Sequence, residues 1–500
     1  MNLFIETGLN IKNQKILKYV YPIGCMQEWV QKWLLEQRGK GEVGLEVKEL
    51  NTGFYVYRST TYWDKELKKR RKKSNYLGVL DCNNGLALSK KPIISASHIR
   101  TIWNYGTAAI LNHAIQELIP PLQEAFPDIW EEICVLAQVR MLGYIPLKRV
   151  ECAWNELYNI QSLSPTVNPK HLAKILSWIG NNRQGQNQVF RYLTQSDNYL
   201  IYDLSAIFSR SEGVSFNERG YNKNKLFLPQ LNLALLCSAY DNLPAMIRLV
   251  PGSVRDISTL QRSIEEINVE GKTLILDTGF YSANTLKFLI KSKWSFIIPT
   301  KRNSKFYETS VTMTTHFFYH DRLIKASKHA IQDFYCYRFE DSDLKIDEER
   351  SIYKQFDEGK ITLEKMKNSL EKAGNILMVS NLDSEPKDIF LLYKRRDMVE
   401  KHYDSFKTLL EADRIYLQSD DTVFGHIFIS FLSLYGYTKI QNILKKYDLI
   451  NRYSPRDIFA LYAKVKIVDF DGNMMILEIP KKIRDLNQKM QLDLFPKPPS

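Results

Sequence analysis

Two short stretches decide the fold of this 500-residue chain: residues 198–207, NYLIYDLSAI, and residues 273–278, TLILDT. Each contains an apolar run closed by a carboxylate, Asp203 in the first and Asp277 in the second. Apolar runs of this length are typical of buried strands. Amphipathic helical patterns (DISTLQRSIEEI, SANTLKFLIKS) alternate with these and further apolar runs, which predicts an α/β fold.

The two aspartates are the first candidates for chemistry. A carboxylate that closes a parallel-type strand lies at the carboxyl edge of the sheet, where α/β folds build their sites. Asp203 and Asp277 together offer the oxygen ligands that hard divalent cations prefer. Taken singly, each is more simply explained as the cap of a following helix. A third element is needed to decide between these interpretations.

That third element is predicted as a helix over residues 388–412. Tyr393, Arg396, Glu400 and Lys407 lie at offsets 0, 3, 7 and 14, which places them within a stripe of roughly 60° on one helix face. Apolar residues of the same helix point the other way, towards a core: Leu392, Met398, Val399, Phe406, Leu409 and Leu410. One carboxylate among cations and a phenol suggests a metal ion with a phosphate. A solvated face with helical ion pairs explains the stripe equally well.

The charge balance indicates a polyanionic partner. Lys and Arg number 69 against 56 Asp and Glu, a net charge of +13. A surface this basic commonly meets nucleic acid or an acidic membrane, and an inert charged surface is the alternative. The longest apolar run, residues 427–434, is far shorter than the ~20 residues that span a bilayer, and the first residues show no secretory signal pattern. We therefore predict no membrane partner.

Part of the positive charge is concentrated in one basic run of the chain. Seven of the nine residues 65–73 are cationic, and the strand-like text before them ends in Tyr62 and Trp63. A cationic loop beside aromatic residues suits a phosphate backbone with exposed bases. A solvated loop or a localisation tag remains the alternative. The residues of this run assigned to DNA binding are Lys68, Lys69, Arg70, Arg71, Lys72 and Lys73.

The pattern along the chain predicts its organisation. Helical periodicity runs from about residue 98 to 181, strand and helix alternate up to residue 301, and a strand-rich stretch then interrupts them. Six cysteines without C-x-x-C spacing indicate a reducing compartment. The predicted parts are a basic, mostly helical DNA-binding region over 1–195, a catalytic core over 196–301 and 388–450, a β-rich insertion over 302–387, and a C-terminal segment over 451–500 as a candidate for dimerisation.

With these residues assembled, the sequence resembles the DDE transposases of bacterial insertion sequences. The spacing Tyr393-x2-Arg396-x3-Glu400-x6-Lys407 matches in full the Y-x2-R-x3-E-x6-K signature of the branch numbered four and its relatives. YDLSAIFSRSEG and LDTGFYSANTLKFL resemble the blocks that carry the first and second Asp of that family, and GHIFISFLSLYGY resembles the helix after the Glu. The resemblance covers roughly residues 50–480.

The resemblance implies a ribonuclease-H-like catalytic core with Asp203, Asp277 and Glu400 as catalytic residues and metal ligands. It implies two Mg²⁺ ions, with Mn²⁺ as a substitute, that clamp the scissile phosphate between an attacking and a leaving oxygen. Tyr393, Arg396 and Lys407 are then DNA contacts. Lys301 and Arg302, which open the insertion, suit further backbone contacts, and a solvated loop explains them equally well. Relatives cut through a hairpin intermediate with a flipped base, but this insertion has no Trp, so the hairpin step stays open.

The leading hypothesis is a cut-and-paste DNA transposase that binds the terminal inverted repeats of its element, pairs the ends as a homodimer and joins them to target DNA. Its partner is double-stranded DNA, and its location is the bacterial cytoplasm, on the nucleoid when bound. Two alternatives remain. One is a DNA-binding protein of transposase descent that no longer cuts, and the other is a different two-metal nuclease or phosphatase of the same fold.

Overall fold

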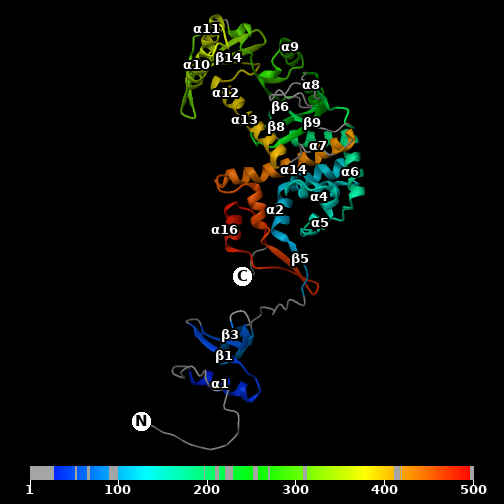
Figure 1. Cartoon of the computed structure of the whole chain (residues 1–500), viewed down its shortest axis with the longest axis vertical. Helices are drawn as coiled ribbons and strands as arrows, with labels where there is room; N and C mark the ends of the chain where they lie inside the picture. The colour runs from blue at the N-terminus through cyan, green and yellow to red at the C-terminus, as the bar shows by residue number, and fades with distance from the viewer. Residues whose placement is uncertain are drawn as a thin grey trace, which may run out of the picture. The chain divides into compact units, whose positions relative to one another are not determined.

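The computed structural model describes residues 27–50, 53–64, 68–88, 99–195, 197–208, 213–219, 229–251, 257–267, 271–307, 312–409, 417 and 419–495. Residues 65–67 of the basic run and Leu410 of the predicted helix lie outside them. The chain divides into two compact units, Met1–His98 and Ile99–Ser500, and each is described by itself (Figure 1).

Unit 1 is a small sheet covered by one helix. Its elements are α1 (Glu28–Gly39), β1 (Leu45–Leu50), β2 (Gly53–Asp64), β3 (Lys69–Asp81) and β4 (Gly85–Leu88), with the strands in the antiparallel order β1-β2-β3-β4. Val30 of α1 packs with Val47, Val56 and Leu80 in a core of its own. The basic run therefore forms a strand in place of the predicted loop, because every residue from Lys69 to Lys73 pairs with a residue of β2.

Unit 2 begins with a short strand and a helical segment. Its elements are β5 (Ile99–Asn104), α2 (Tyr105–Ile115), η2 (Gln116–Leu118), α3 (Ile119–Ala125), α4 (Trp130–Met141), α5 (Leu147–Asn155), α6 (Pro169–Asn181) and α7 (Arg183–Thr194). The side chain of Asn168 caps α6 by accepting from the His171 amide, and Pro169 occupies its first turn. A single helical region over 1–195 is therefore not observed: its described first part is mostly strand, and the helices belong to unit 2.

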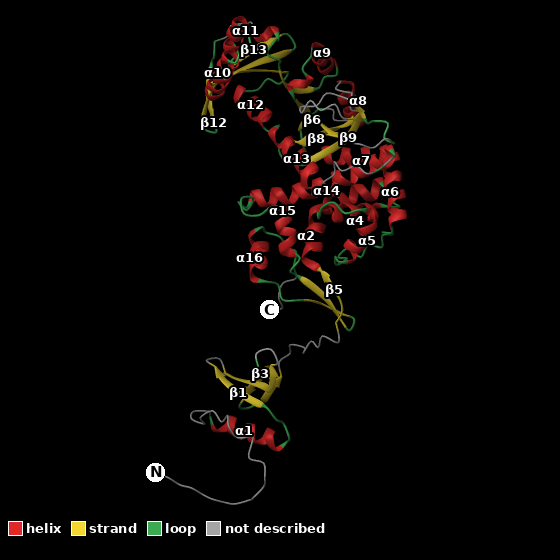
Figure 2. Ribbon diagram, in the orientation of Figure 1, coloured by secondary structure: helices red, strands yellow, loops and turns green. Residues whose placement is uncertain are grey.

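Residues 196–301, the predicted first part of the catalytic core, form one end of a ten-stranded sheet (Figure 2). The elements in this stretch are β6 (Tyr199–Phe208), β7 (Glu218–Arg219), β8 (Pro229–Ser238), β9 (Pro244–Pro251), α8 (Ile257–Ile267), β10 (Thr273–Leu276), η3 (Thr278–Phe280), α9 (Ala283–Lys291) and β11 (Ser295–Pro299). Strands β9, β8 and β6 are antiparallel neighbours, and β6, β10 and β11 run parallel. This order and direction are those of the ribonuclease-H-like fold, so the predicted fold class is confirmed.

Residues 302–387 extend the same sheet. They form η4 (Lys305–Tyr307), β12 (Thr315–Tyr319), β13 (Arg322–Ile331), β14 (Phe334–Asp341), α10 (Ser342–Asp357), α11 (Leu363–Glu371) and β15 (Asn375–Ser380). Strand β15 pairs antiparallel with β11, and β14, β13 and β12 follow outwards. The edge of β11 would otherwise leave backbone donors and acceptors without partners, and β15 satisfies them.

The remaining elements close the unit. They are α12 (Pro386–Lys394), α13 (Asp397–Asp404), η5 (Ser405–Leu409), α14 (Asp420–Lys446), α15 (Pro455–Tyr462), β16 (Lys466–Phe470), β17 (Asn473–Ile476) and α16 (Lys481–Lys489). Strand β16 pairs with both β17 and β5, so the C-terminal segment folds against the start of unit 2. No described helix is long and apolar enough to cross a membrane.

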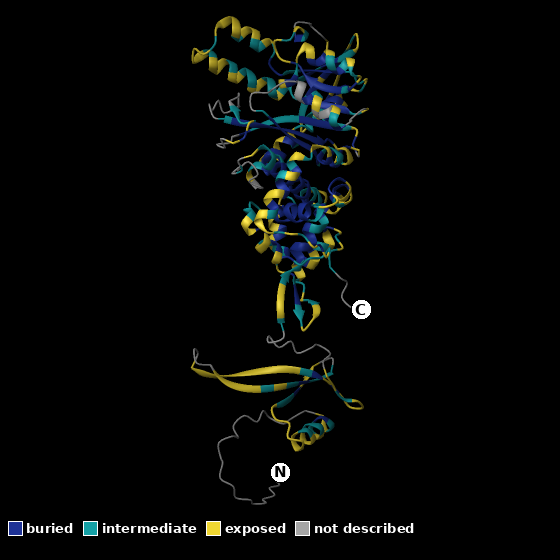
Figure 3. Ribbon diagram, turned by 90° about the vertical axis from the view of Figure 1, so that its right-hand side faces the viewer, coloured by how far each residue is buried: buried dark blue, intermediate teal, exposed yellow. Residues whose placement is uncertain are grey.

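Helix α14 joins the helical segment to the sheet. It contacts α2, α4, α6 and β9, and most of its residues are buried (Figures 2 and 3). Two glycines allow the close crossing with α6: a Cβ on Gly425 would stand 1.9 Å from the carbonyl oxygen of Leu176, and one on Gly180 would stand 1.8 Å from that of Asp421. The backbones touch only because both positions lack a side chain.

Candidate active site

The structure places Asp203 and Asp277 on neighbouring parallel strands. In the register of β6 and β10, Tyr202 lies opposite Leu276, so Asp203 and Asp277 are the next residue of each strand beyond the last pair. The prediction that Asp203 ends its strand is wrong, because β6 continues to Phe208 on the side that pairs with β8. On the β10 side, however, the ladder stops at Tyr202, so the two aspartates occupy corresponding positions directly beyond it.

The helix that carries Glu400 is broken into three pieces. The sequence predicts one helix, but α12 ends at Lys394, α13 begins at Asp397, and a π-helix, η5, starts at Ser405. A tertiary contact lies at the first break. The guanidinium of Arg395 donates from Nη1 to the carbonyl oxygen of Ala239 over 2.9 Å and lies 4.3 Å from the ring centre of Tyr240. A uniform stripe of about 60° therefore does not exist, although Leu392, Val399 and Phe406 are buried as predicted.

Arg396 lies among the three acids. Its Nη1 stands 3.5 Å from Oδ1 of Asp277, and the side chain is only 17% exposed. Burial lowers the pKa of Arg396, but the opposing influence of Tyr393, Asp277, Asp203 and Glu400 is larger, and the net pKa is raised. All three carboxylates therefore act on one guanidinium. Among the described residues, nothing accepts a hydrogen bond from its buried Nε.

Tyr393 borders the same guanidinium from α12. The guanidinium carbon of Arg396 lies 5.7 Å from the centre of the Tyr393 ring. Burial raises the pKa of the Tyr393 hydroxyl, and Asp277 raises it further, while Arg396 and Thr278 lower it. Because the net shift is upward, the phenol is neutral at ordinary pH and available as a hydrogen-bond donor.

Tyr403 and Lys407 fix the Glu400 helix to the strand of Asp203. The buried Tyr403 hydroxyl donates to the carbonyl oxygens of Asp203, over 2.8 Å, and Leu233, over 3.1 Å. The Lys407 ammonium donates to Ser205 Oγ over 2.7 Å and to the Ala206 carbonyl oxygen over 2.8 Å. Sequence reasoning found Lys407 but not Tyr403, whose one signal was a tyrosine three residues after Glu400.

The donor chemistry of the site suits a hard divalent cation. Asp203, Asp277 and Glu400 supply carboxylate oxygens from three separate segments. Within the described part of the chain, which includes all three, no group of three His, Cys, Asp or Glu side chains is close enough to hold a metal ion. In the structure the positive charge beside Asp277 is the Arg396 guanidinium.

The other predicted DNA contacts lie elsewhere. Lys301 is exposed after β11, and Arg302 donates to Glu348 of α10 over 2.5 and 2.8 Å, so this arginine is held by the insertion. Lys68 precedes β3, and Lys69, Arg70, Arg71, Lys72 and Lys73 are exposed along it. These six belong to unit 1, whereas the acids belong to unit 2.

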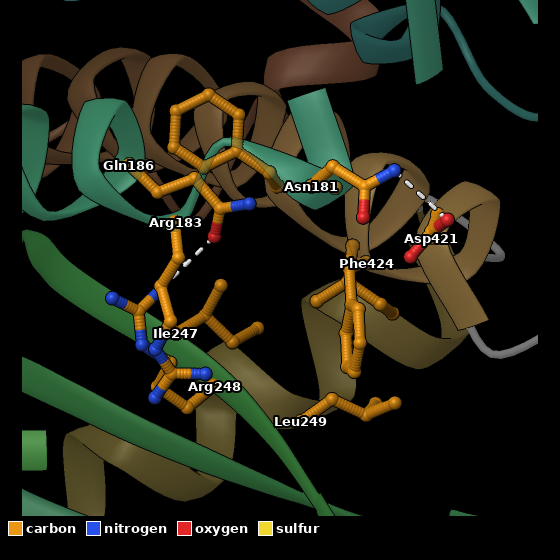
Figure 4. Close-up of a pocket in the computed structure, with 11 residues that line it drawn as sticks. Asn181, Arg183, Gln186, Ile247, Arg248, Leu249, Asp421 and Phe424 are labelled. Carbon is orange, nitrogen blue, oxygen red and sulfur yellow. Dashed lines mark hydrogen bonds between the residues drawn. The ribbon is translucent and has the colours of Figure 1, made fainter. Parts of the chain in front are cut away.

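A pocket of about 210 Å³ lies between α6, α7, β9 and α14 (Figure 4). Its charged groups are engaged with protein partners. Arg183 binds Glu266 over 2.8 Å, Arg248 donates to Gln186 over 3.0 Å, and Asp421 accepts from Asn181 over 2.9 Å. The residues that line it include none of the three acids or the cations beside them, so the pocket is a junction between helices and sheet and not part of this site.

Known proteins were compared with the chain by sequence and by structure. Residues 198–435 match the family model described as "Transposase DDE domain". The match spans Asp203, Asp277 and Glu400 and supports the resemblance to DDE transposases over that segment, while the branch stays a prediction. The search of curated proteins finds no match. Among solved structures, a piggyBac transposase synaptic complex with hairpin DNA resembles the chain at 10% identity and a TM-score of 0.38, over 81% of this chain and 87% of that one.

Proposed function

We propose that this chain is a DNA transposase that binds the terminal inverted repeats of an insertion sequence of the branch numbered four. It would cut the element out and join it to target DNA by phosphodiester hydrolysis and strand transfer. The observation that carries the proposal is the register that sets Asp203 and Asp277 one residue beyond the same pair of parallel strands, with Arg396 at 3.5 Å from Asp277 and four residues before Glu400. The domain match over residues 198–435 supports it.

Asp203, Asp277 and Glu400 would hold two Mg²⁺ ions, or Mn²⁺ in their place. When bound, the ions supply an activated hydroxyl nucleophile and stabilise the leaving oxygen of the phosphodiester. The chain's own residues do the rest. Arg396 would exchange its contact with Asp277 for a DNA phosphate, which a planar guanidinium can bind through two parallel hydrogen bonds. Tyr393, as a neutral phenol, would donate a hydrogen bond to the same backbone.

Lys407 and Tyr403 have supporting roles in this proposal. Both hold the Glu400 helix against β6, so that the three acids keep their relative positions while DNA enters. Lys407 also brings a positive charge to within a few residues of Asp203, where phosphate would lie. Lys301, Arg302 and the cations Lys68–Lys73 would contact the DNA backbone further along.

The proposed partner is double-stranded DNA, as element ends and as target, bound by a homodimer that pairs two ends. The proposed location is the bacterial cytoplasm, on the nucleoid. An experiment must separate this proposal from two alternatives. One is a transposase-derived protein that binds ends without cutting them, and the other is another two-metal nuclease of this fold.

The test uses the full-length protein, a labelled duplex that carries the inverted repeat flanking its gene, and Mg²⁺. We expect Mg²⁺-dependent nicking at the repeat boundary and joining of the cut end to a second duplex. Chelation of the metal should stop both reactions and leave binding intact. Binding without any nicking would identify a DNA-binding protein without catalysis. Cleavage that ignores the repeat and joins nothing would identify a different nuclease.

A further inference from the structure

The sheet of unit 1 has one covered face and one open face. Helix α1 covers the face that carries Val47, Val56 and Leu80, and the ring of Trp29 lies 5.1 Å from that of Phe54. Because side chains alternate along a strand, the intervening residues point away from α1. This second face has no described element of unit 1 packed on it.

Hydrogen bonds establish which residues belong to the open face. Ser59 Oγ and Ser74 Oγ are 2.7 Å apart across the β2–β3 ladder, and Ser59 Oγ also donates to Glu46 of β1 over 3.1 Å. Lys72 forms an ion pair with the same Glu46. By the strand period of two, Thr61, Trp63 and Arg70 share this face, with Trp63 opposite Arg70 and Thr61 opposite Lys72.

The open face joins aromatic rings to positive charge. Tyr57 and Tyr76 lie opposite each other with ring centres 5.4 Å apart, and the ammonium of Lys48 stands 4.8 Å from the centre of the Tyr57 ring. Trp63 is 59% exposed. Contacts place one acid, Glu46, on this face, and Glu46 is paired with Lys72. Arg70 and Lys48 remain as positive charges directed outward.

The outer half of the β2–β3 hairpin extends beyond the shorter strands. Strand β1 pairs with β2 only up to Arg58, and β4 pairs with β3 only from Gly78, so residues 59–64 and 69–74 form a two-stranded ribbon (Figure 3). Strands in a sheet are about 4.8 Å apart. A ribbon of two strands therefore fits the major groove of B-DNA, which is about 12 Å wide.

We propose that unit 1 docks on double-stranded DNA through the open face, with the β2–β3 ribbon in a groove and Arg70 and Trp63 turned towards the duplex. On the face that carries α1 the ribbon itself is exposed, but there a helix about 10 Å across would hold the duplex away from the four-stranded part of the sheet. The cations Lys69, Arg71 and Lys73 then point away from the groove floor. This inference rests on the proposed function only in that DNA is the partner, and it is independent of cleavage.

Adjacent residues on opposite faces give the test matched controls. Arg70→Gln and Arg71→Gln remove the same charge from neighbouring exposed positions, and Trp63→Ala and Tyr62→Ala remove neighbouring exposed rings. Binding of the full-length variants to a fluorescein-labelled 30-base-pair duplex of mixed sequence is measured without divalent metal at several salt concentrations. Far-ultraviolet circular dichroism and Tm verify that each variant is folded, and Arg70→Lys tests whether charge alone restores binding.

We expect Arg70→Gln to raise Kd about tenfold and to reduce the slope of log Kd against log salt by about 0.9, and Arg71→Gln to change Kd less than about twofold. Trp63→Ala should weaken binding more than Tyr62→Ala. An equal or larger loss for Arg71→Gln would overturn the assignment of the face. Tighter binding to the single strands than to the duplex would overturn the proposal that the ribbon lies in a groove of double-stranded DNA. If the wild type binds no DNA, the partner named under the proposed function fails as well.

Discussion

In unit 2 the candidate site residues are acids: Asp203 within β6, Asp277 directly after β10 and beside the Arg396 guanidinium, and Glu400 on α13. In the sheet of unit 1 they are cations, spread along strands that are exposed to solvent. Acids brought together in a partly buried place repel one another and attract cations, which suits a reaction centre. Cations displayed on a ribbon attract a polyanion without fixing any reacting atom. The contrast predicts that chemistry and affinity reside in different units.

The largest expected effect, and the strongest test of this contrast, comes from the removal of one acid. Glu400→Gln should reduce cleavage by about 10³-fold or more, because a proposed metal ligand is lost, and should leave Kd for the duplex within about twofold. Asp404→Asn, one turn further along α13 and equally exposed, removes the same charge and should leave cleavage unchanged. Gel assays of nicking and anisotropy measurements of binding provide the two readings. Parallel loss of binding and cleavage would mean that Glu400 acts on structure or affinity.

Two adjacent arginines sharpen the contrast within the acidic site. Arg396→Gln removes the guanidinium beside Asp277 and should reduce cleavage about 10²-fold with little change in Tm. Arg395→Gln removes the hydrogen bond to the Ala239 carbonyl oxygen and should cost about 2 kcal/mol of unfolding free energy, seen as a lower Tm. If Arg396→Gln lowers affinity as strongly as cleavage, this cation belongs with the binding cations of unit 1.

The smallest expected effect concerns a neutral side chain. Tyr403→Phe removes the hydrogen bonds to the carbonyl oxygens of Asp203 and Leu233 and should cost about 1–3 kcal/mol in stability. Because Tyr403 positions the Asp203 strand, cleavage should also fall about tenfold in kcat with KM little changed. Tyr435→Phe loses a comparable hydrogen bond to Glu117, far along the chain from the acids, and should lower Tm alone. Equal kcat for the two variants would reduce Tyr403 to a structural role.

Much of the candidate site could be predicted because its signals are local. Apolar runs of four residues followed by Asp, and four residues at fixed spacing around Glu400, are readable without any knowledge of contacts. The prediction failed where contacts with residues far away in the chain decide the local structure. The Arg395–Ala239 contact accompanies a break in a helix that the local pattern predicts as continuous. The cations 69–73 show no apolar alternation, and only their pairing with β2 makes them a strand.

The boundary near residue 98 shows the same limit. The periodicity of α2, α4 and α6 is visible in the sequence, but nothing local says that these helices pack on α14, more than 200 residues later. The predicted basic region was therefore drawn too long, and its helices belong to the unit that carries the acids. The role of Gly180 and Gly425 at the α6–α14 crossing can be recognised only once the positions of the two helices are known.

By itself, the sequence determined the fold class and the basic character of the N-terminal part, and it predicted the three acids with their neighbouring cations, since each depends on residue type and on spacing within one segment. The tertiary structure alone decided that Arg396 stands against Asp277, that Tyr403 ties the Glu400 helix to the Asp203 strand, and that the basic run is one edge of a ribbon with two different faces. These facts are distances between segments far apart in the chain, and packing and strand register, not local propensity, set such distances.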